Sequence, residues 1–228
     1  MTIPCDAKIK VITKQFVVDM SDSLPSFESL VQDLKHPNPN IRDEACVLLA
    51  EHWPDQAMPY FFSELEDPDP VVYRTAVKAL GTLGPRTLPD LLKLFQSSGN
   101  GTVRACCVKA IVQISVNFPN AAFPADILSM LEQALDDSSP VVAQSALMTL
   151  GYLSKHDSEK DRVIPLLIQA CDRANIAHVQ GSAMALAELD SPLVSAFLEK
   201  LALDDTKDPL IREVAQSSLE RRASLNLK

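Results

Sequence analysis

Glycine, aromatic residues and long apolar runs are all scarce in this sequence. Six glycines and 5% aromatic residues in 228 argue against a β-sandwich or β-barrel, since those folds depend on tight turns and aromatic motifs. No apolar run approaches the roughly 20 residues that a membrane-spanning helix needs. The first residues show no basic segment followed by an apolar one, as a secretory signal would. We therefore expect a cytoplasmic protein without membrane insertion.

Positive charge is also in short supply. Lysine and arginine number 21 against 30 acidic residues, which gives a formal net charge of −9. Sequence-independent binding to nucleic acid or to an anionic membrane requires a basic face. The balance therefore predicts no nucleic-acid partner. Hydrophobic residues at 46% and charged residues at 22% are ordinary for a folded globular chain.

The cysteines lack the spacing of a metal or redox site. Five occur, at positions 5, 46, 106, 107 and 171, and no pair forms Cys-x-x-Cys. Cys106 and Cys107 are adjacent, and neighbours on a helix point about 100° apart, so they cannot easily share one metal ion. We expect reduced and mostly buried thiols, with Cys5 in a loose N-terminal arm, and no resident metal or cofactor.

A repeat of six copies runs through most of the chain. Each copy has a small residue as its anchor: Ala45, Ala76, Cys107, Ala146, Ala183 and Ala215. Successive anchors are 31, 31, 39, 37 and 32 residues apart. A β-branched residue stands four positions before each anchor, and an apolar residue stands four positions after it. This spacing forms one stripe of an α-helix and excludes strand alternation.

A second apolar segment precedes each anchor helix, separated from it by a tight turn. Pro59, Pro89 and Pro165 are expected in the first turn of such helices, where proline costs no hydrogen bond. Neither helix of a unit can bury its stripe alone, so the units must stack. We predict an all-α fold, an α-solenoid of about six helix-turn-helix repeats over residues 25–228. Residues 1–24 form an N-terminal arm or cap.

Two stretches interrupt the repeat. The first, around residues 115–126, carries Phe118 and Phe123 beside two prolines. It is either a loop that docks a partner, as loops on solenoids often do, or a longer connection whose rings pack on the core. The second, residues 154–162, is charged and is expected to be a solvated loop.

No catalytic constellation is visible in the sequence. Zinc-protease, hydrolase, P-loop and dinucleotide motifs are absent. Three pairs of aspartates occur in the expected turns, at residues 67 and 69, 136 and 137, and 204 and 205. Carboxylates there cap the following helix and complement its dipole. We therefore predict no catalytic residue and no metal site.

Exposed positions on the second helix of each unit are the best binding candidates, because those helices line the concave face of stacked helical repeats. They are Arg42, Tyr73, Lys78, Arg104, Lys109, Gln144 and Gln180. The arginines could instead form a ladder with acidic turn residues such as Asp69 and Asp208. Trp53, the only tryptophan, is either an interface hot spot or part of the core of the first repeat.

The period and the order of helix, turn and helix resemble HEAT repeats. Residues 72–81, 100–104 and 139–151 are similar to the HEAT-like repeats of the cyanobacterial phycobilisome lyase group, over residues 27–222. That group includes bilin lyase subunits, a phycobilisome-degradation protein, and a small HEAT protein associated with an iron–sulfur assembly scaffold. Residues 112–124 resemble the last of these most.

The resemblance implies two hypotheses. The preferred one is an interaction scaffold or chaperone-like adaptor that holds a phycobiliprotein or an iron–sulfur assembly factor on its concave face. The alternative is a bilin lyase or lyase subunit that binds a phycobilin transiently while a partner cysteine is attached or released. Arg42, Lys78, Arg104 and Lys109 would then contact the anionic propionates.

Overall fold

The structure, a computed structural model, describes residues 24–172 and 175–225, and every regular element in that part is helical. The prediction of an all-α fold is therefore confirmed. The elements are α1 (Phe27–Asp33), α2 (Pro39–His52), α3 (Pro54–Glu64), α4 (Pro70–Leu83), the 3₁₀ helix η1 (Gly84–Thr87), α5 (Leu88–Ser97), α6 (Gly101–Asn117), α7 (Ala125–Ala134), α8 (Pro140–Leu153), α9 (Asp157–Cys171), α10 (Ile176–Ala187), α11 (Pro192–Leu203) and α12 (Pro209–Ser224). The predicted arm or cap at residues 1–24, with Cys5, lies almost wholly outside these ranges.

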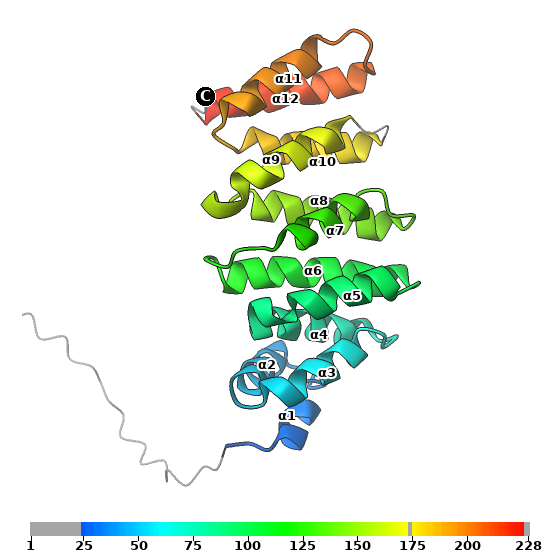
Figure 1. The fold of residues 1–228 in the computed structure, drawn as a ribbon, viewed down its shortest axis with the longest axis vertical. Coiled ribbons are helices and arrows are strands. Elements are labelled where there is room, and N and C mark those ends of the chain that lie inside the picture. Colours follow the sequence, from blue (N-terminus) through cyan, green and yellow to red (C-terminus); the bar gives the residue numbers. More distant parts are fainter. Residues whose placement is uncertain (1–23, 173–174, 226–228) are drawn as a thin grey trace, which may run out of the picture.

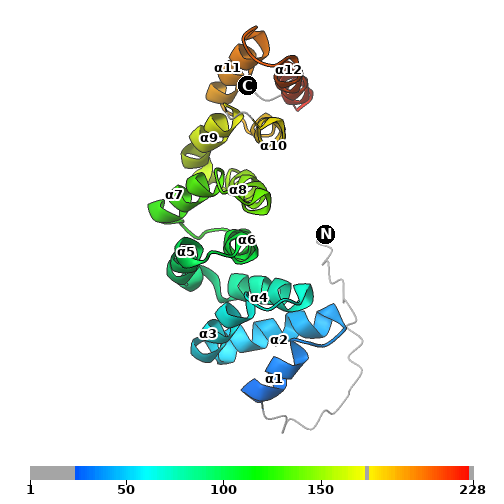
Figure 2. The same ribbon diagram turned by 90° about the vertical axis from the view of Figure 1, so that its right-hand side faces the viewer.

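The helices pair into six antiparallel units that stack into a solenoid (Figure 1). The odd-numbered helices α1 to α11 are the A helices, and the even-numbered helices α2 to α12 are the B helices. Each B helix packs closely on the next B helix, whereas neighbouring A helices barely touch. The stack is therefore shorter along its B side and curves toward it. Figure 2 shows the B helices together on the inner side of this curve.

The anchor residues lie at the contacts between repeats. All six are buried, with at most 2% of each side chain exposed. Small residues at these points let adjacent B helices approach closely, and the apolar residues on either side fill the space between the A and B layers. The core is one continuous cluster that runs the length of the stack.

The turns between A and B helices follow a shared capping pattern. An Asn or Asp side chain at the N-cap accepts a hydrogen bond from the backbone N–H two residues later in α2, α4, α6, α10 and α12. Asp67, Asp137 and Asp204 also accept backbone N–H groups within their own turns, at 2.7, 2.8 and 3.1 Å. Of the paired aspartates, Asp69 caps its helix as predicted, whereas Asp67, Asp137 and Asp204 accept backbone N–H groups of the turn itself.

The predicted solvated loop at residues 154–162 is wrong. Helix α9 begins at Asp157 and absorbs most of it. The charged appearance misled the prediction because Glu159 is 1% exposed and is paired with Arg162. Pro165 lies inside α9 and Pro59 inside α3, since both helices begin one or two turns earlier than expected. Pro89 does stand in the first turn of α5.

The loop after α6 is fastened to the next repeat. Phe123 is 2% exposed, and its backbone N–H donates to Glu159 Oε1 at 3.1 Å while its carbonyl accepts from Arg162 Nη1 at 2.8 Å. The docking interpretation is therefore corrected for Phe123, whose ring fills the core. Phe118 is 37% exposed and its ring covers Gly84, where φ is 78° and an added Cβ would lie 2.5 Å from the ring.

Candidate binding face of the B helices

The concave face is formed by one stripe of each B helix. The stripe occupies positions five and two residues before the anchor and two and six residues after it. In α2 these are Asn40, Asp43, Val47 and Glu51; in α4, Val71, Arg74, Lys78 and Thr82; in α8, Val141, Gln144, Met148 and Tyr152; in α12, Leu210, Glu213, Ser217 and Arg221. All are exposed except Thr82, which is half-buried. In α10 the same spacing occurs one residue earlier, at Ala177, Gln180, Met184 and Glu188.

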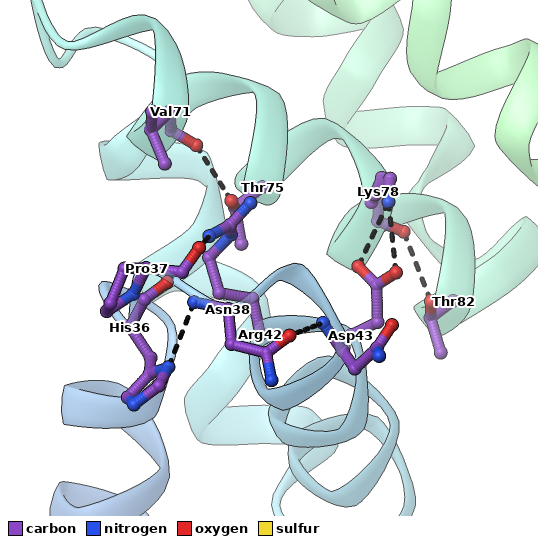
Figure 3. Close-up of polar contacts among 10 residues, drawn as sticks. His36, Pro37, Asn38, Arg42, Asp43, Val71, Thr75, Lys78 and Thr82 are labelled. Carbon is purple, nitrogen blue, oxygen red and sulfur yellow. Dashed lines mark hydrogen bonds and ion pairs between the residues drawn. The ribbon is translucent and has the colours of Figure 1, made fainter.

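Three predicted binding residues lie outside this stripe. Arg42, Tyr73 and Arg104 stand three residues before their anchors, about 100° around the helix from the stripe position that follows each of them. Arg42 Nη1 donates to the carbonyl oxygens of His36 and Pro37, at 2.6 and 3.0 Å (Figure 3). The Tyr73 ring packs against the core. These side chains hold their own turns or the core together.

Arg104 joins the third repeat to the fourth. Its Nε and Nη2 donate to the two carboxylate oxygens of Asp137, each at 2.7 Å, and Nη1 donates to the carbonyl of Ser98 at 3.0 Å. The Asp137 hydrogen bond raises the pKa of Arg104, and the same hydrogen bond lowers the pKa of Asp137. The predicted arginine ladder is thus present at Arg104, with Asp137 as its acid.

Charged side chains lie on the concave face of the first three repeats, beside the exposed Val47 and Val71. Lys78 Nζ lies 3.0 and 3.1 Å from the carboxylate oxygens of Asp43 on the preceding B helix (Figure 3). Arg74 and Lys109 are exposed and form no ion pair within the described residues. Of the four cations predicted to meet an anionic ligand, Lys78 and Lys109 therefore face the concave side.

An apolar channel crosses the concave face of the last three repeats. Three hollows of about 400, 280 and 590 Å³ lie there: the first two occupy the two ends of the groove between α8 and α10, and the third lies between α10 and α12. The first two share Met148 and the last two share Met184. We define the apolar channel by Val141, Met148, Tyr152, Met184 and Leu210, each between 45% and 55% exposed.

Polar groups form the edges of the apolar channel. Gln144 lines the first hollow and Gln180 the last, as the sequence predicted for two concave residues. Glu188, the C-cap of α10, is bridged by Lys155, which follows α8, at 3.2 Å and by Arg221 of α12. The hydrogen bond from Lys155 is the main cause of a lowered pKa at Glu188. This bridge links three consecutive B helices along one edge.

Sequence reasoning missed Met148 and Met184 because an apolar residue on a helix reads as core. For Met148, a signal lies in a comparison between repeats. Two residues after the anchor, the second and third repeats have Lys78 and Lys109, whereas the fourth has Met148. An apolar residue at a position that carries charge elsewhere indicates an exposed contact rather than packing.

Trp53 lies between α2 and α3, is half-buried, and packs against the core with His52 edge-on at 5.9 Å. Part of the Trp53 ring is therefore buried against the core, and a direct role of this residue in binding stays a prediction.

The described cysteines are buried thiols without a disulfide. Burial raises the pKa of Cys46, Cys107 and Cys171 to about 12, and it also raises that of Cys106. These thiols are therefore protonated and inert near neutral pH, as predicted. Within residues 24–172 and 175–225, three or more potential metal ligands come together nowhere, and none of the helices is long and apolar enough to cross a bilayer.

The chain matches known proteins along most of its length. Residues 27–112 and 128–220 match the HEAT repeats family. Bilin biosynthesis protein CpeZ from Synechococcus sp. strain WH8020 is 53% identical over 182 residues, covering 80% of this chain and 98% of that protein. An uncharacterized phycocyanin operon protein Z from Pseudanabaena tenuis strain PCC 7409 is 29% identical over 197 residues, 86% of this chain and 95% of that protein.

A solved structure shares the fold. The complex of CpcE and CpcF of phycocyanin lyase from Nostoc sp. PCC7120 contains a chain that superimposes with a TM-score of 0.54 at 20% identity. That match covers 72% of this chain and 98% of the Nostoc chain.

Proposed function

The chain belongs to the HEAT-repeat family and to the same cyanobacterial group as CpeZ, and on that basis we propose that it is a HEAT-repeat subunit of a phycobilin lyase. In this role it holds a phycobiliprotein on its concave face while a bilin is joined to, or released from, a cysteine of that partner. The observation that carries the proposal is 53% identity over nearly the whole length of a protein named for bilin biosynthesis.

The thiol chemistry of the chain supports a role in holding the reactants rather than in attacking the bilin. Thioether formation adds a thiol across a carbon–carbon double bond, so the sulfur bonds to carbon and its proton ends on the tetrapyrrole. No oxidant or reductant is consumed. Cys46, Cys107 and Cys171, with pKa values of about 12, supply almost no thiolate. None of the cysteines that the structure describes therefore suits the attack, so we assign the attacking sulfur to the partner and the positioning of the reactants to this chain.

The cations of the concave face suit an anionic ligand. Propionates of a bilin, or carboxylates of the partner, would meet Lys78, Lys109 and Arg74, since these side chains are exposed on the concave face. Arg42 and Arg104 are not proposed for this contact, because backbone carbonyls and Asp137 already use their guanidinium groups.

A second candidate function is a chaperone-like adaptor for a phycobiliprotein. The apolar channel favours it, because an exposed apolar strip of this kind suits a protein surface. The named relatives concern bilins and phycocyanin, which favours a phycobiliprotein over an iron–sulfur assembly factor as the partner.

Deletion and complementation in a cyanobacterium that carries the gene tests both functions. Peptide mass spectrometry of purified phycobiliproteins measures bilin occupancy at each attachment cysteine, and immunoblotting measures total apo-subunit. For a lyase subunit, occupancy falls at one or more cysteines while apo-subunit persists. For an adaptor, the apo-subunit itself is lost. Unchanged occupancy and unchanged apo-subunit would refute both.

The variant Lys109→Ala sharpens the test, with Lys93→Ala, an exposed lysine of the A helix α5, as its matched control. We expect complementation by Lys109→Ala to restore occupancy several-fold less well than the control does. Equal restoration would remove Lys109 from the proposed contact.

A further inference from the structure

The groove between α8 and α10 runs along these two helices and therefore across the stack. The hollow of about 400 Å³ at one end is bordered by Pro140, and the hollow of about 280 Å³ at the other end is bordered by Tyr152. These two residues are 152 − 140 = 12 positions apart on α8, so a rise of 1.5 Å per residue gives the groove a length of about 18 Å. Met148 borders both hollows and is 52% exposed, which makes the middle of the groove apolar.

A cation and an amide stand at the first end of the groove. Lys109 of α6 and Gln144 of α8 border that hollow, and both are exposed. Lys109 forms no ion pair within the described residues, and none of the described residues that border the hollow is acidic. Ammonium and amide N–H groups both donate hydrogen bonds to carboxylates. The first end therefore suits a carboxylate.

The second end of the groove also carries an excess of positive charge. Lys155 lies 3.2 Å from Glu188 Oε2, and Arg221 Nη2 donates to the other oxygen of the same carboxylate. Two cations therefore share one carboxylate. The side chains of Lys155 and Arg221 are 61% and 52% exposed, so a further carboxylate can reach them from solvent. The charge at both ends thus has the same sign, although the whole chain has a net charge of −9.

These charges define the chemistry of a complementary occupant. It has an apolar group in the middle and a carboxylate on either side, far enough apart to reach both ends of the groove. A bilin does not meet this requirement, because its two propionates stand on neighbouring inner rings and are too close together. A protein segment with acidic residues on both sides of an apolar residue does meet it, whether the segment is helical or extended.

We propose that the groove between α8 and α10 binds a segment of a partner protein in which an apolar residue lies between two acidic residues. Lys109 with Gln144 receives one carboxylate, and Lys155 receives the other, while the apolar side chain contacts Met148. Glu188 competes with the second carboxylate, because it already occupies the same cations. Identifying the partner as a phycobiliprotein subunit rests on the proposed function above.

Removal of the competing carboxylate gives the sharpest test. Titration calorimetry measures binding of the apo-phycobiliprotein subunits of the same cyanobacterium, one by one. Glu188→Gln should tighten binding at least threefold. The control Glu213→Gln changes the net charge equally, at an exposed residue that borders only the hollow between α10 and α12, and should change binding less than twofold. Equal effects of the two variants, weaker binding by Glu188→Gln, or no binding of any subunit by the wild type would overturn the proposal.

Removal of the cations gives the opposite expectation. Lys109→Gln and Lys155→Gln should each weaken binding several-fold, and the differences from wild type should shrink at high salt, because salt screens exposed charges. Lys93→Gln, an exposed lysine of α5, is the matched control and should change binding less than twofold. Thermal unfolding should stay close to wild type, since exposed ion pairs contribute little to stability. Unchanged affinity in both groove variants would overturn the proposal.

Photo-crosslinking identifies the bound segment. A photoreactive phenylalanine analogue is placed at position 148, or at position 47 as the control, because Val47 is 42% exposed and occupies the place of Met148 in the first repeat. From position 148, half the groove is about 9 Å, or about six residues of a helix. The partner residue crosslinked there should have acidic residues within about six positions on both sides, and position 47 should not reach that segment. A crosslinked segment without them, a second copy of the chain, or residues 1–23 would overturn the proposal.

Failure of this proposal is separable from failure of the proposed function. If Lys155→Gln binds the apo-subunit normally and restores bilin occupancy in the deletion strain, the groove is not the docking site, although the lyase function stands. If deletion leaves occupancy and apo-subunit unchanged, while Glu188→Gln tightens and Lys155→Gln weakens binding of a subunit, the groove is a docking site and the lyase function fails.

Discussion

The first two and the last three repeats bury the same positions of their B helices, but they expose different residues on the concave face. In α2 and α4 the stripe carries the ion pair of Asp43 and Lys78 beside the exposed Val47 and Val71. In α8 and α10 the corresponding stripes carry Met148 and Met184, about half exposed. The anchors beneath them are equally buried in both regions. Stacking of the repeats therefore constrains the buried side of each B helix. The residues of the exposed stripe can vary and can be suited to a ligand.

The difference divides the concave face by role. The apolar region offers area, and apolar area removed from water contributes about 25 cal/mol per Å². The charged region offers direction and selectivity, because exposed ion pairs contribute little affinity but steer a partner. A partner that uses both regions would gain affinity from the apolar channel and orientation from Lys78 and Lys109.

The largest expected effect tests whether the buried stripes are equivalent. Leu80 of α4 and Leu150 of α8 are both fully buried, four residues after their anchors. Truncating a buried leucine costs about 2–5 kcal/mol through lost burial and the cavity left behind. We expect Leu80→Ala and Leu150→Ala to lower the free energy of unfolding by similar amounts in urea titrations. A cost below about 1 kcal/mol in only one region would break the equivalence.

The fold could be read from the sequence because its signal is local and repeated. Ala76 and Ala146 stand in the same phrase, and six copies specify helix, turn and stacking together. The direction in which a single side chain points from its helix was harder to predict. Arg104 and its neighbour Ala105 differ by about 100° of rotation, and only packing decides which one faces the next repeat. The structure turns Arg104 toward Asp137, 33 residues away.

Long-range contacts and exposed apolar residues account for the other features that were not predicted from the sequence. The buried Glu159 was misread because its partners are Arg162 and the backbone of Phe123, 36 residues earlier. The pair with Arg162 is a local one, three residues apart on α9, but no local pattern indicates the contact with Phe123. The apolar channel was missed for another reason, since the sequence cannot show whether Met184 lies under or beside the next helix.

The second effect concerns the junction between the charged and the apolar region. Arg104 and Asp137 meet there with only 15% and 10% of their side chains exposed. Removing Arg104 leaves a mostly buried carboxylate without its cation, so Arg104→Ala should cost about 2 kcal/mol. Arg42→Ala, which loses two carbonyl contacts near the surface, should cost about 1 kcal/mol. A double-mutant cycle with Asp137→Ala isolates the pair, and coupling near zero would contradict its role as a fastener.

The third effect is the pH dependence of the same junction. The hydrogen bond from Arg104 lowers the pKa of Asp137, so the folded state binds fewer protons than the unfolded state in the acid range. The stabilisation is therefore complete above the ordinary aspartate pKa of about 4 and is lost as the pH falls through the lower folded value. The difference in unfolding free energy between wild type and Asp137→Asn should be larger at pH 7 than at pH 3. A difference that grows on acidification would contradict this sign.

The smallest effect on stability is expected at Lys78, where function and fold should separate. Lys78 and Asp43 are 54% and 51% exposed, and an exposed pair contributes about 0–1 kcal/mol. Lys78→Ala should leave the urea midpoint nearly unchanged. If Lys78 meets a carboxylate of the bilin or of the partner, the variant should still lower bilin occupancy in the complemented strain, and more so at high salt, since screening weakens the remaining cations. Lost occupancy at unchanged stability would assign the charged region to binding. Lost stability of more than about 1 kcal/mol would instead place Lys78 with Arg104, as a fastener between repeats.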